Sequence, residues 1–149
     1  MECLMKTSLK IIAFLFFFIM PFSSQASELP SIIEYVENND MEDEFHLSSL
    51  YNRCAGIIGA YAKYIPSSMK EEKNRLADIS GQYFEAAGML LYEKKMTEPA
   101  EILEQVQKAY LYYVDTYYSE IEITQIRTGS IFEGRLNDEF KFCMAIREM

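Results

Sequence analysis

Four segments of the chain repeat large apolar residues at alternating spacings of three and four, which is the pattern of amphipathic helices. The predicted helices span about residues 45–65, 69–96, 98–127 and 131–148. Each apolar stripe covers one face only, so each helix must bury that face against the others. This pattern restricts the fold to a packed, all-α domain.

Proline and glycine mark the breaks between these helices. Pro66 ends the first helix, Pro99 fits only the first turn of the third, with Thr97 as its N-cap, and Gly129 ends the third. Two capping boxes predict the starts of the second and fourth helices: Ser68 with Glu71, and Ser130 with Glu133. Because connections of about two to four residues join antiparallel neighbours, we expect an antiparallel up-down four-helix bundle. Residues 121–126 alternate apolar and polar, so an extended segment is the alternative there.

Cys54 and Cys143 lie in the apolar stripes of the first and fourth helices. In an oxidising compartment these two thiols have one intramolecular pairing, and buried free thiols are the alternative. In an up-down bundle the first and fourth helices are adjacent and antiparallel. The two positions then differ in height by only about 6 Å at 1.5 Å per residue. A disulfide between Cys54 and Cys143 is therefore predicted.

The first 26 residues have the pattern of a signal peptide. Lys6 and Lys10 precede an apolar run (Ile11 to Met20), and the small residues Ser24 and Ala26 follow it, which predicts cleavage after Ala26. The run is about a dozen residues, short of the about 20 that span a membrane, although an uncleaved anchor is the alternative. Cys3 precedes the run, where a lipid-attachment cysteine would not lie. We expect a periplasmic or secreted protein.

The predicted mature chain, residues 27–149, begins with a short N-terminal segment and acidic linker (27–44) before the bundle domain (45–149). Residues 31–38 of this segment are expected to form a short helical piece. Loss of Glu2, Lys6 and Lys10 with the leader changes the formal net charge from −9 to −10. This acidity disfavours nucleic acid and anionic membrane surfaces as partners, because both select clustered Lys and Arg. It fits a basic protein partner, or simple solubility.

The sequence contains few residues in patterns typical of catalytic, metal-binding or cofactor-binding sites. Its single histidine, His46, has only Asp43 at a metal-ligand spacing, and no phosphate-binding, dinucleotide-binding, haem-attachment or nucleophile-elbow motif occurs. The acidic residues spread over the predicted solvent-facing sides, so no catalytic pair stands out. We therefore predict no catalytic residue, no metal site and no cofactor.

Two groups of residues suggest contact surfaces. Leu111, Tyr112 and Tyr118 point away from the inner stripe of the third helix, so they form either a partner surface or a face covered by the N-terminal segment. Small residues crowd the first helix, where they serve either tight internal packing or a docking groove: Ala55, Gly56, Gly59, Ala60 and Ala62.

Together these features predict a non-enzymatic, exported helical module that binds another protein. A small-ligand carrier with a cavity between the helices is the first alternative. A carboxylate-dependent hydrolase is the second.

Overall fold

The structure, a computed structural model, describes residues 29–93 and 98–147. The leader, Thr97 and the predicted ends of the second and fourth helices lie outside these residues. The described chain forms α2 (Ile32–Asn38), α3 (Glu44–Tyr64), a 3-10 turn η2 (Ser67–Met69), α4 (Lys70–Glu93), α5 (Pro99–Thr128) and α6 (Gly134–Ile146). No strand occurs in this part of the chain, and the all-α prediction is confirmed.

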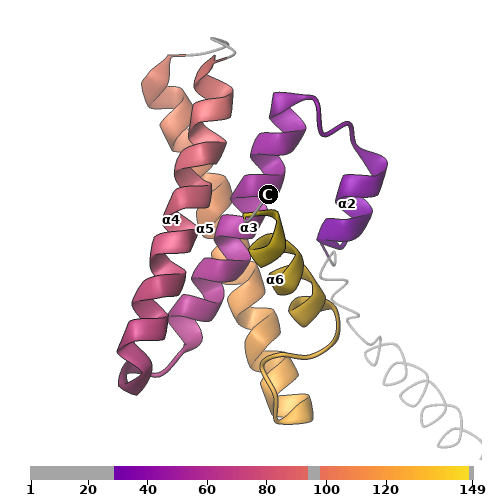
Figure 1. Cartoon of the computed structure of the whole chain (residues 1–149), viewed down its shortest axis with the longest axis vertical. Helices are drawn as coiled ribbons and strands as arrows, with labels where there is room; N and C mark the ends of the chain where they lie inside the picture. Colours follow the sequence, from indigo (N-terminus) through magenta and orange to yellow (C-terminus); the bar gives the residue numbers. More distant parts are fainter. Residues whose placement is uncertain (1–28, 94–97, 148–149) are drawn as a thin grey trace, which may run out of the picture.

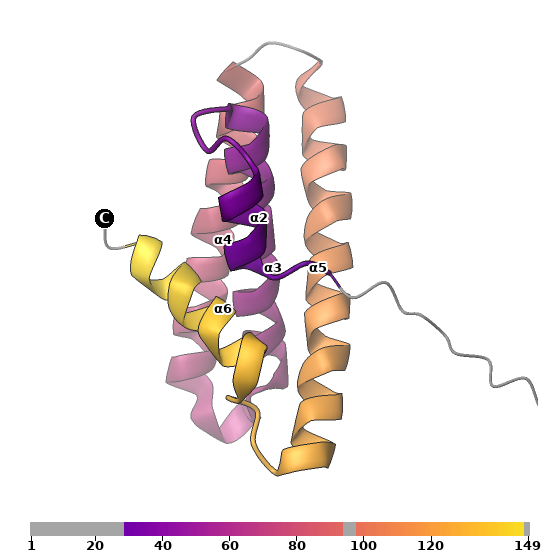
Figure 2. The same cartoon turned by 90° about the vertical axis from the view of Figure 1, so that its right-hand side faces the viewer.

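The helix α3 lies at the centre of the molecule. Every residue from Asn52 to Ala62 is buried, so the burial goes well beyond the single stripe that the sequence predicts. Helix α4 packs on one side of α3, α2 and α6 lie on the other, and α5 flanks it (Figures 1 and 2). The small residues of α3 permit this, because they let several neighbours approach its backbone.

The regular four-helix bundle is not confirmed. Helix α6 is short and crosses α3 obliquely instead of running alongside it (Figure 2). Helices α4 and α5 contact α3 more extensively than they contact each other. The structure therefore shows helices gathered around one central helix, with antiparallel connections between α3, α4 and α5.

The helix ends follow local chemistry. The Asp43 carboxylate accepts a hydrogen bond from the Phe45 amide at 2.7 Å and begins α3. Gly129 adopts φ 78° and ends α5, as predicted. Residues 121–126 are helical and belong to α5, which excludes the extended alternative.

The two predicted capping boxes are wrong in detail. The chain enters α4 through η2, where the Met69 amide donates to the Pro66 carbonyl at 3.0 Å. Helix α6 begins at Gly134, after a turn in which the Ser130 hydroxyl accepts from the Phe132 amide at 3.1 Å. At Ser130 the departure arises because a serine hydroxyl can also bond locally within a turn. At η2 no side chain caps the turn, and the backbone bond to Pro66 leads the chain into α4.

The main hydrophobic core surrounds α3 and includes the buried tyrosines Tyr61 and Tyr117. A smaller cluster of Ala87, Ile102 and Val106 lies between α4 and α5. None of the helices that the structure describes is both long enough and apolar enough to cross a membrane.

Candidate functional site: an apolar groove between α4 and α5

The surface is hollowed between α4 and α5, near the end at which these helices are joined. The groove has a volume of about 390 Å³. Both helices contribute to its walls, which consist of Phe84, Glu85, Gly88, Met89 and Tyr92 of α4, and Pro99, Ile102, Leu103 and Val106 of α5. Among these residues Glu85 alone is charged.

The way in which α4 and α5 are held on α3 leaves this space open. The Ser48 hydroxyl of α3 donates to the Ala87 carbonyl of α4 at 2.8 Å, and the Asn52 amide of α3 donates to the Val106 carbonyl of α5 at 3.0 Å. Both helices are therefore fixed to α3, and they contact each other less extensively than they contact α3. Gly88 adds to the opening, since a Cβ built there would meet nothing within 4 Å.

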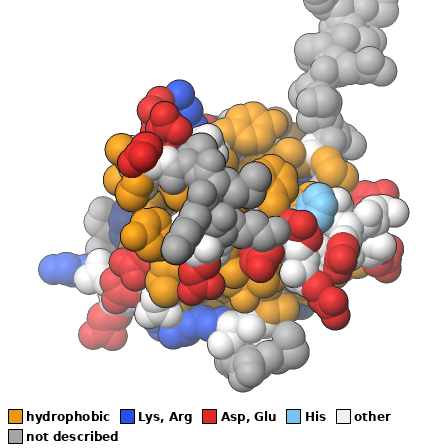
Figure 3. All heavy atoms as spheres, turned by 90° about the horizontal axis from the view of Figure 1, so that it is seen from above, with side chains coloured by type: hydrophobic (Ala, Val, Ile, Leu, Met, Phe, Trp, Pro, Cys, Tyr) orange, Lys and Arg blue, Asp and Glu red, His pale blue; other side chains and the backbone are white. Residues whose placement is uncertain are grey.

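The rim of the groove is apolar and exposed. Met89 is 63% exposed, Tyr92 59% and Leu103 57%. Burying such side chains against a ligand is favourable by about 25 cal/mol per Å². Seen from the joined end of α4 and α5, hydrophobic side chains lie among acidic ones (Figure 3). Exposed apolar residues that gather at a concave site are typical of a binding surface.

Part of this groove can be recognised from the spacing of apolar residues in the sequence. The spacing of Leu103, Val106 and Tyr110 predicts that all three face inward on the third helix, but the structure exposes Leu103 in the groove. The inner stripe of α4 contains the buried residues Leu76, Ile79, Tyr83 and Ala87. Phe84, Met89 and Tyr92 lie outside it, on a second face of that helix. That second apolar face is the sequence signal for the groove, whereas the opening between α4 and α5 depends on the tertiary arrangement.

The predicted partner surface on α5 is only partly open. Leu111 and Tyr112 are 50% and 54% exposed. Tyr118 is half-buried: its ring lies 5.6 Å from the ring of Tyr64, and the Lys63 ammonium lies 4.6 Å from its centre. Internal contacts therefore account for Tyr118, and Leu111 and Tyr112 remain as candidate partner contacts.

The small residues of α3 serve internal packing. A Cβ built on Gly56 would lie 2.3 Å from the Cβ of Tyr113, and one on Gly59 would lie 2.8 Å from the hydroxyl of Tyr110. Ala55, Ala60 and Ala62 are buried. Tyr110 and Tyr113 of α5 therefore fill the space beside these glycines, so the alternative of a docking groove for another chain does not hold here.

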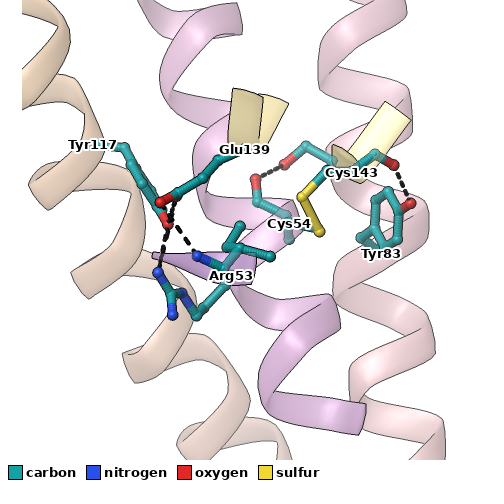
Figure 4. Close-up of a disulfide and its surroundings, with 9 residues drawn as sticks. Arg53, Cys54, Tyr83, Tyr117, Glu139 and Cys143 are labelled. Atoms are coloured by element: carbon teal, nitrogen blue, oxygen red, sulfur yellow. Dashed lines mark hydrogen bonds and ion pairs between the residues drawn. A yellow bond between two sulfur atoms is a disulfide. The ribbon is translucent and has the colours of Figure 1, made fainter. Parts of the chain in front are cut away.

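The disulfide between Cys54 and Cys143 is present and joins α3 to α6 (Figure 4). The two Cα atoms are 5.4 Å apart, and both residues are fully buried. The Tyr83 hydroxyl of α4 donates to the Cys143 carbonyl, so α6 is also tied to α4. Burial raises the pKa of Tyr83 to about 12.

A buried polar network lies beside this disulfide (Figure 4). The Arg53 guanidinium donates to the Tyr117 hydroxyl at 3.0 Å, and that hydroxyl donates to the Glu139 carboxylate at 2.7 Å. Burial raises the pKa of Tyr117, with the Glu139 charge contributing. Arg135 also donates to Glu139, at 2.6 Å, and pairs with Glu120. The network joins α3, α5 and α6.

The same network holds the N-terminal segment. Arg53 donates to the Pro30 carbonyl at 2.6 Å, and the Glu139 carboxylate accepts from the Ile32 amide at 3.2 Å. The guanidinium carbon also lies 5.7 Å from the ring centre of Tyr35 and 5.9 Å from that of Tyr113. These contacts pair the two buried charges, although the Arg53 Nε has no hydrogen-bond partner among the described residues, and they position α2. The role that we assign to them is therefore structural.

His46, the single histidine of the sequence, belongs neither to the groove between α4 and α5 nor to the buried polar network. Its Nδ1 is 3.3 Å from the Tyr35 hydroxyl, which links α3 to α2. Among residues 29–93 and 98–147, no three His, Cys, Asp or Glu side chains converge as metal ligands.

In comparisons with known proteins, no family model, no curated protein and no solved structure matches this chain.

Proposed function

We propose that the protein is an exported, non-enzymatic module that binds another protein, and that the groove between α4 and α5 is its binding site. The exposure of Met89, Tyr92 and Leu103 around one concavity carries the proposal. A monomeric surface rarely keeps apolar side chains gathered in this way unless they contact a ligand. Methionine suits such a contact, because its flexible thioether adapts to the shape of a partner.

Two further features support export and a non-enzymatic role. The leader pattern of residues 1–26 fits a disulfide-bonded protein, because disulfides persist in oxidising compartments. A carboxylate-dependent hydrolase needs two facing acids, and Glu85 is the one acid among the groove-lining residues.

Site-specific photocrosslinking tests the binding site. We expect a photoreactive amino acid at position 89 to form a covalent adduct with a protein in the exported fraction. The same group at Ser119, which is exposed on α5 outside the groove, is the matched control. Adducts of equal yield at both positions, or none at 89, would argue against the groove.

Mass measurement of the exported protein also tests cleavage after Ala26.

A small-ligand carrier is the second candidate, and the size of the groove favours it. Its volume of about 390 Å³ falls within the range of small-molecule sites. Native mass spectrometry separates the two candidates, because a carrier retains a small molecule whose added mass disappears in Leu103→Arg. A protein-binding module shows no such added mass.

A further inference from the structure

The charges beside the groove narrow the choice of partner. We infer that the groove receives a basic amphipathic helix of another protein, an inference that rests on the proposed function. Within 84–93 and 98–106, every charged residue is acidic: Glu85, Glu93, Glu98, Glu101 and Glu104. Lys94 and Lys95 lie between these ranges, outside the described residues. Lys108 follows and is paired with Glu104 at 2.6 Å.

The position of Glu85 connects the acidic character to the groove itself. Glu85 belongs to the lining, with Gly88 and Met89, while Glu93 and Glu98 are exposed at the two helix ends that flank the groove. A partner whose apolar side chains enter the groove therefore places its neighbouring polar residues near carboxylates. Lys or Arg at those places gains attraction, whereas Asp or Glu meets repulsion.

The walls of the groove favour a helical partner. They are two antiparallel helices whose apolar side chains recur every three to five residues along α4, from Phe84 to Tyr92. A partner helix that lies along them presents apolar residues at a matching spacing. A partner that binds as an added β-strand needs a free sheet edge, and the described chain contains no strand.

Matched peptides test the inference against the full, disulfide-bonded chain. The probe is a labelled helical peptide of about 18 residues with a Leu stripe flanked by Lys. One control has the same stripe with Glu in place of Lys, and another has the Lys peptide's composition in scrambled order. By fluorescence anisotropy, we expect the Lys peptide to bind at least about tenfold more tightly than either control. Equal binding of the Lys and scrambled peptides would mean attraction to net charge alone and would overturn the inference.

Paired variants then locate the binding. Glu85→Lys and Glu122→Lys change the net charge equally, but Glu122 is exposed on α5 outside the groove. Leu103→Ser and Ile126→Ser each remove an exposed apolar side chain, within and outside the groove respectively. We expect each groove variant to weaken binding of the Lys peptide about tenfold and each control to leave it unchanged. Melting temperatures establish that all four fold.

The outcomes separate this inference from the proposed function. An adduct at position 89 combined with equal binding of the Lys and Glu peptides keeps the protein-binding site and overturns the basic helix. A retained small molecule without any adduct overturns both. A concentration-dependent dimer that Leu103→Ser abolishes would identify a second copy of the chain as the occupant, which also overturns the inference.

Discussion

Arg53 and Glu139 are almost completely buried, although each is a charged residue on an amphipathic helix. A buried charge is tolerated when it is paired and hydrogen-bonded, and here Tyr117, Pro30 and Ile32 supply the bonds. Removing one partner of such a pair costs about 3–5 kcal/mol, mostly because the other charge stays buried. The network therefore fixes the arrangement of α2 and α6 more than it adds net stability.

At the residue scale, Gly56 has the sharpest steric requirement. Gly56→Ala places a methyl group 2.3 Å from the Tyr113 Cβ, and Tyr113 backbone atoms lie just beyond at 3.1 Å. We expect a loss of about 1–3 kcal/mol in the free energy of unfolding, because α3 and α5 must separate. Urea denaturation followed by circular dichroism measures it.

Gly81→Ala is the matched control. No atom lies within 4 Å of a Cβ at position 81, so alanine should raise helix propensity and stabilise the protein by about 0.5–1 kcal/mol. If Gly56→Ala is as stable as the parent, the close approach of α3 to Tyr113 is wrong.

The sequence predicts individual residues where chemistry leaves few choices. The pairing of Cys54 with Cys143 follows from their being two thiols in one small domain, and the structure confirms it. Burial of Arg53 and Glu139 could not be predicted, because a charged residue within an amphipathic pattern normally faces solvent. Their partners Pro30 and Tyr117 come from distant parts of the chain.

At the element scale, α6 depends most on covalent attachment. It is 13 residues long, and its buried residues are Leu136, Glu139 and Cys143. A helix of this length is marginal in isolation, so tertiary contacts must hold it. The disulfide supplies one anchor to α3, and the bond from Tyr83 supplies another to α4.

Replacing both cysteines by serine tests this anchoring. The disulfide closes a loop with a sequence separation of 89, for which the chain-entropy model gives about 4–5 kcal/mol of stabilisation. We expect a lower free energy of unfolding by up to that amount and faster amide hydrogen exchange in α6 than in α4. Exchange that rises equally in both helices would indicate global destabilisation without a specific role in holding α6.

Helix identity is predictable from the sequence, but helix arrangement is less so. The 3-and-4 spacing, Pro66 and Gly129 place α3, α4 and α5 to within a few residues. The central position of α3 was not predicted, because its glycines and alanines fit either internal packing or a docking groove. Likewise, nothing in the α6 segment indicates that it crosses α3 obliquely. Crossing geometry depends on how side chains of both helices interlock.

At the scale of the whole molecule, acidic residues keep the surface solvated, and buried tyrosines bond one helix to another. The sequence has 23 acidic side chains and a formal net charge of −9, which keeps the surface well solvated and repels other acidic proteins. Of its 11 tyrosines, Tyr61, Tyr83 and Tyr117 are buried, with hydroxyls that bond to other helices or connections. We therefore expect the stability of the molecule to be sensitive to alkaline pH.

Burial raises the pKa of Tyr61, Tyr83 and Tyr117 above the ordinary value of 10.0. Below that pH all three stay protonated in both the folded and unfolded chain, so their contribution to stability is fully present. Above it the unfolded chain releases protons that the folded chain retains. We therefore expect the free energy of unfolding to fall by about 1.4 kcal/mol per pH unit for each such tyrosine. For Tyr83 the fall continues to about pH 12.

Urea denaturation from about pH 9 to about pH 11 measures this slope, and phenolate absorbance shows whether ionisation accompanies unfolding. Tyr83→Phe should make the free energy of unfolding fall less steeply with pH, because one tyrosine no longer contributes. It should also lower that free energy at every pH, because the bond to the Cys143 carbonyl is lost. Tyr112→Phe changes a half-exposed ring and is the matched control. A free energy of unfolding that stays constant across this range would mean that these hydroxyls reach solvent, and the tight packing of Tyr61, Tyr83 and Tyr117 around α3 would then be wrong.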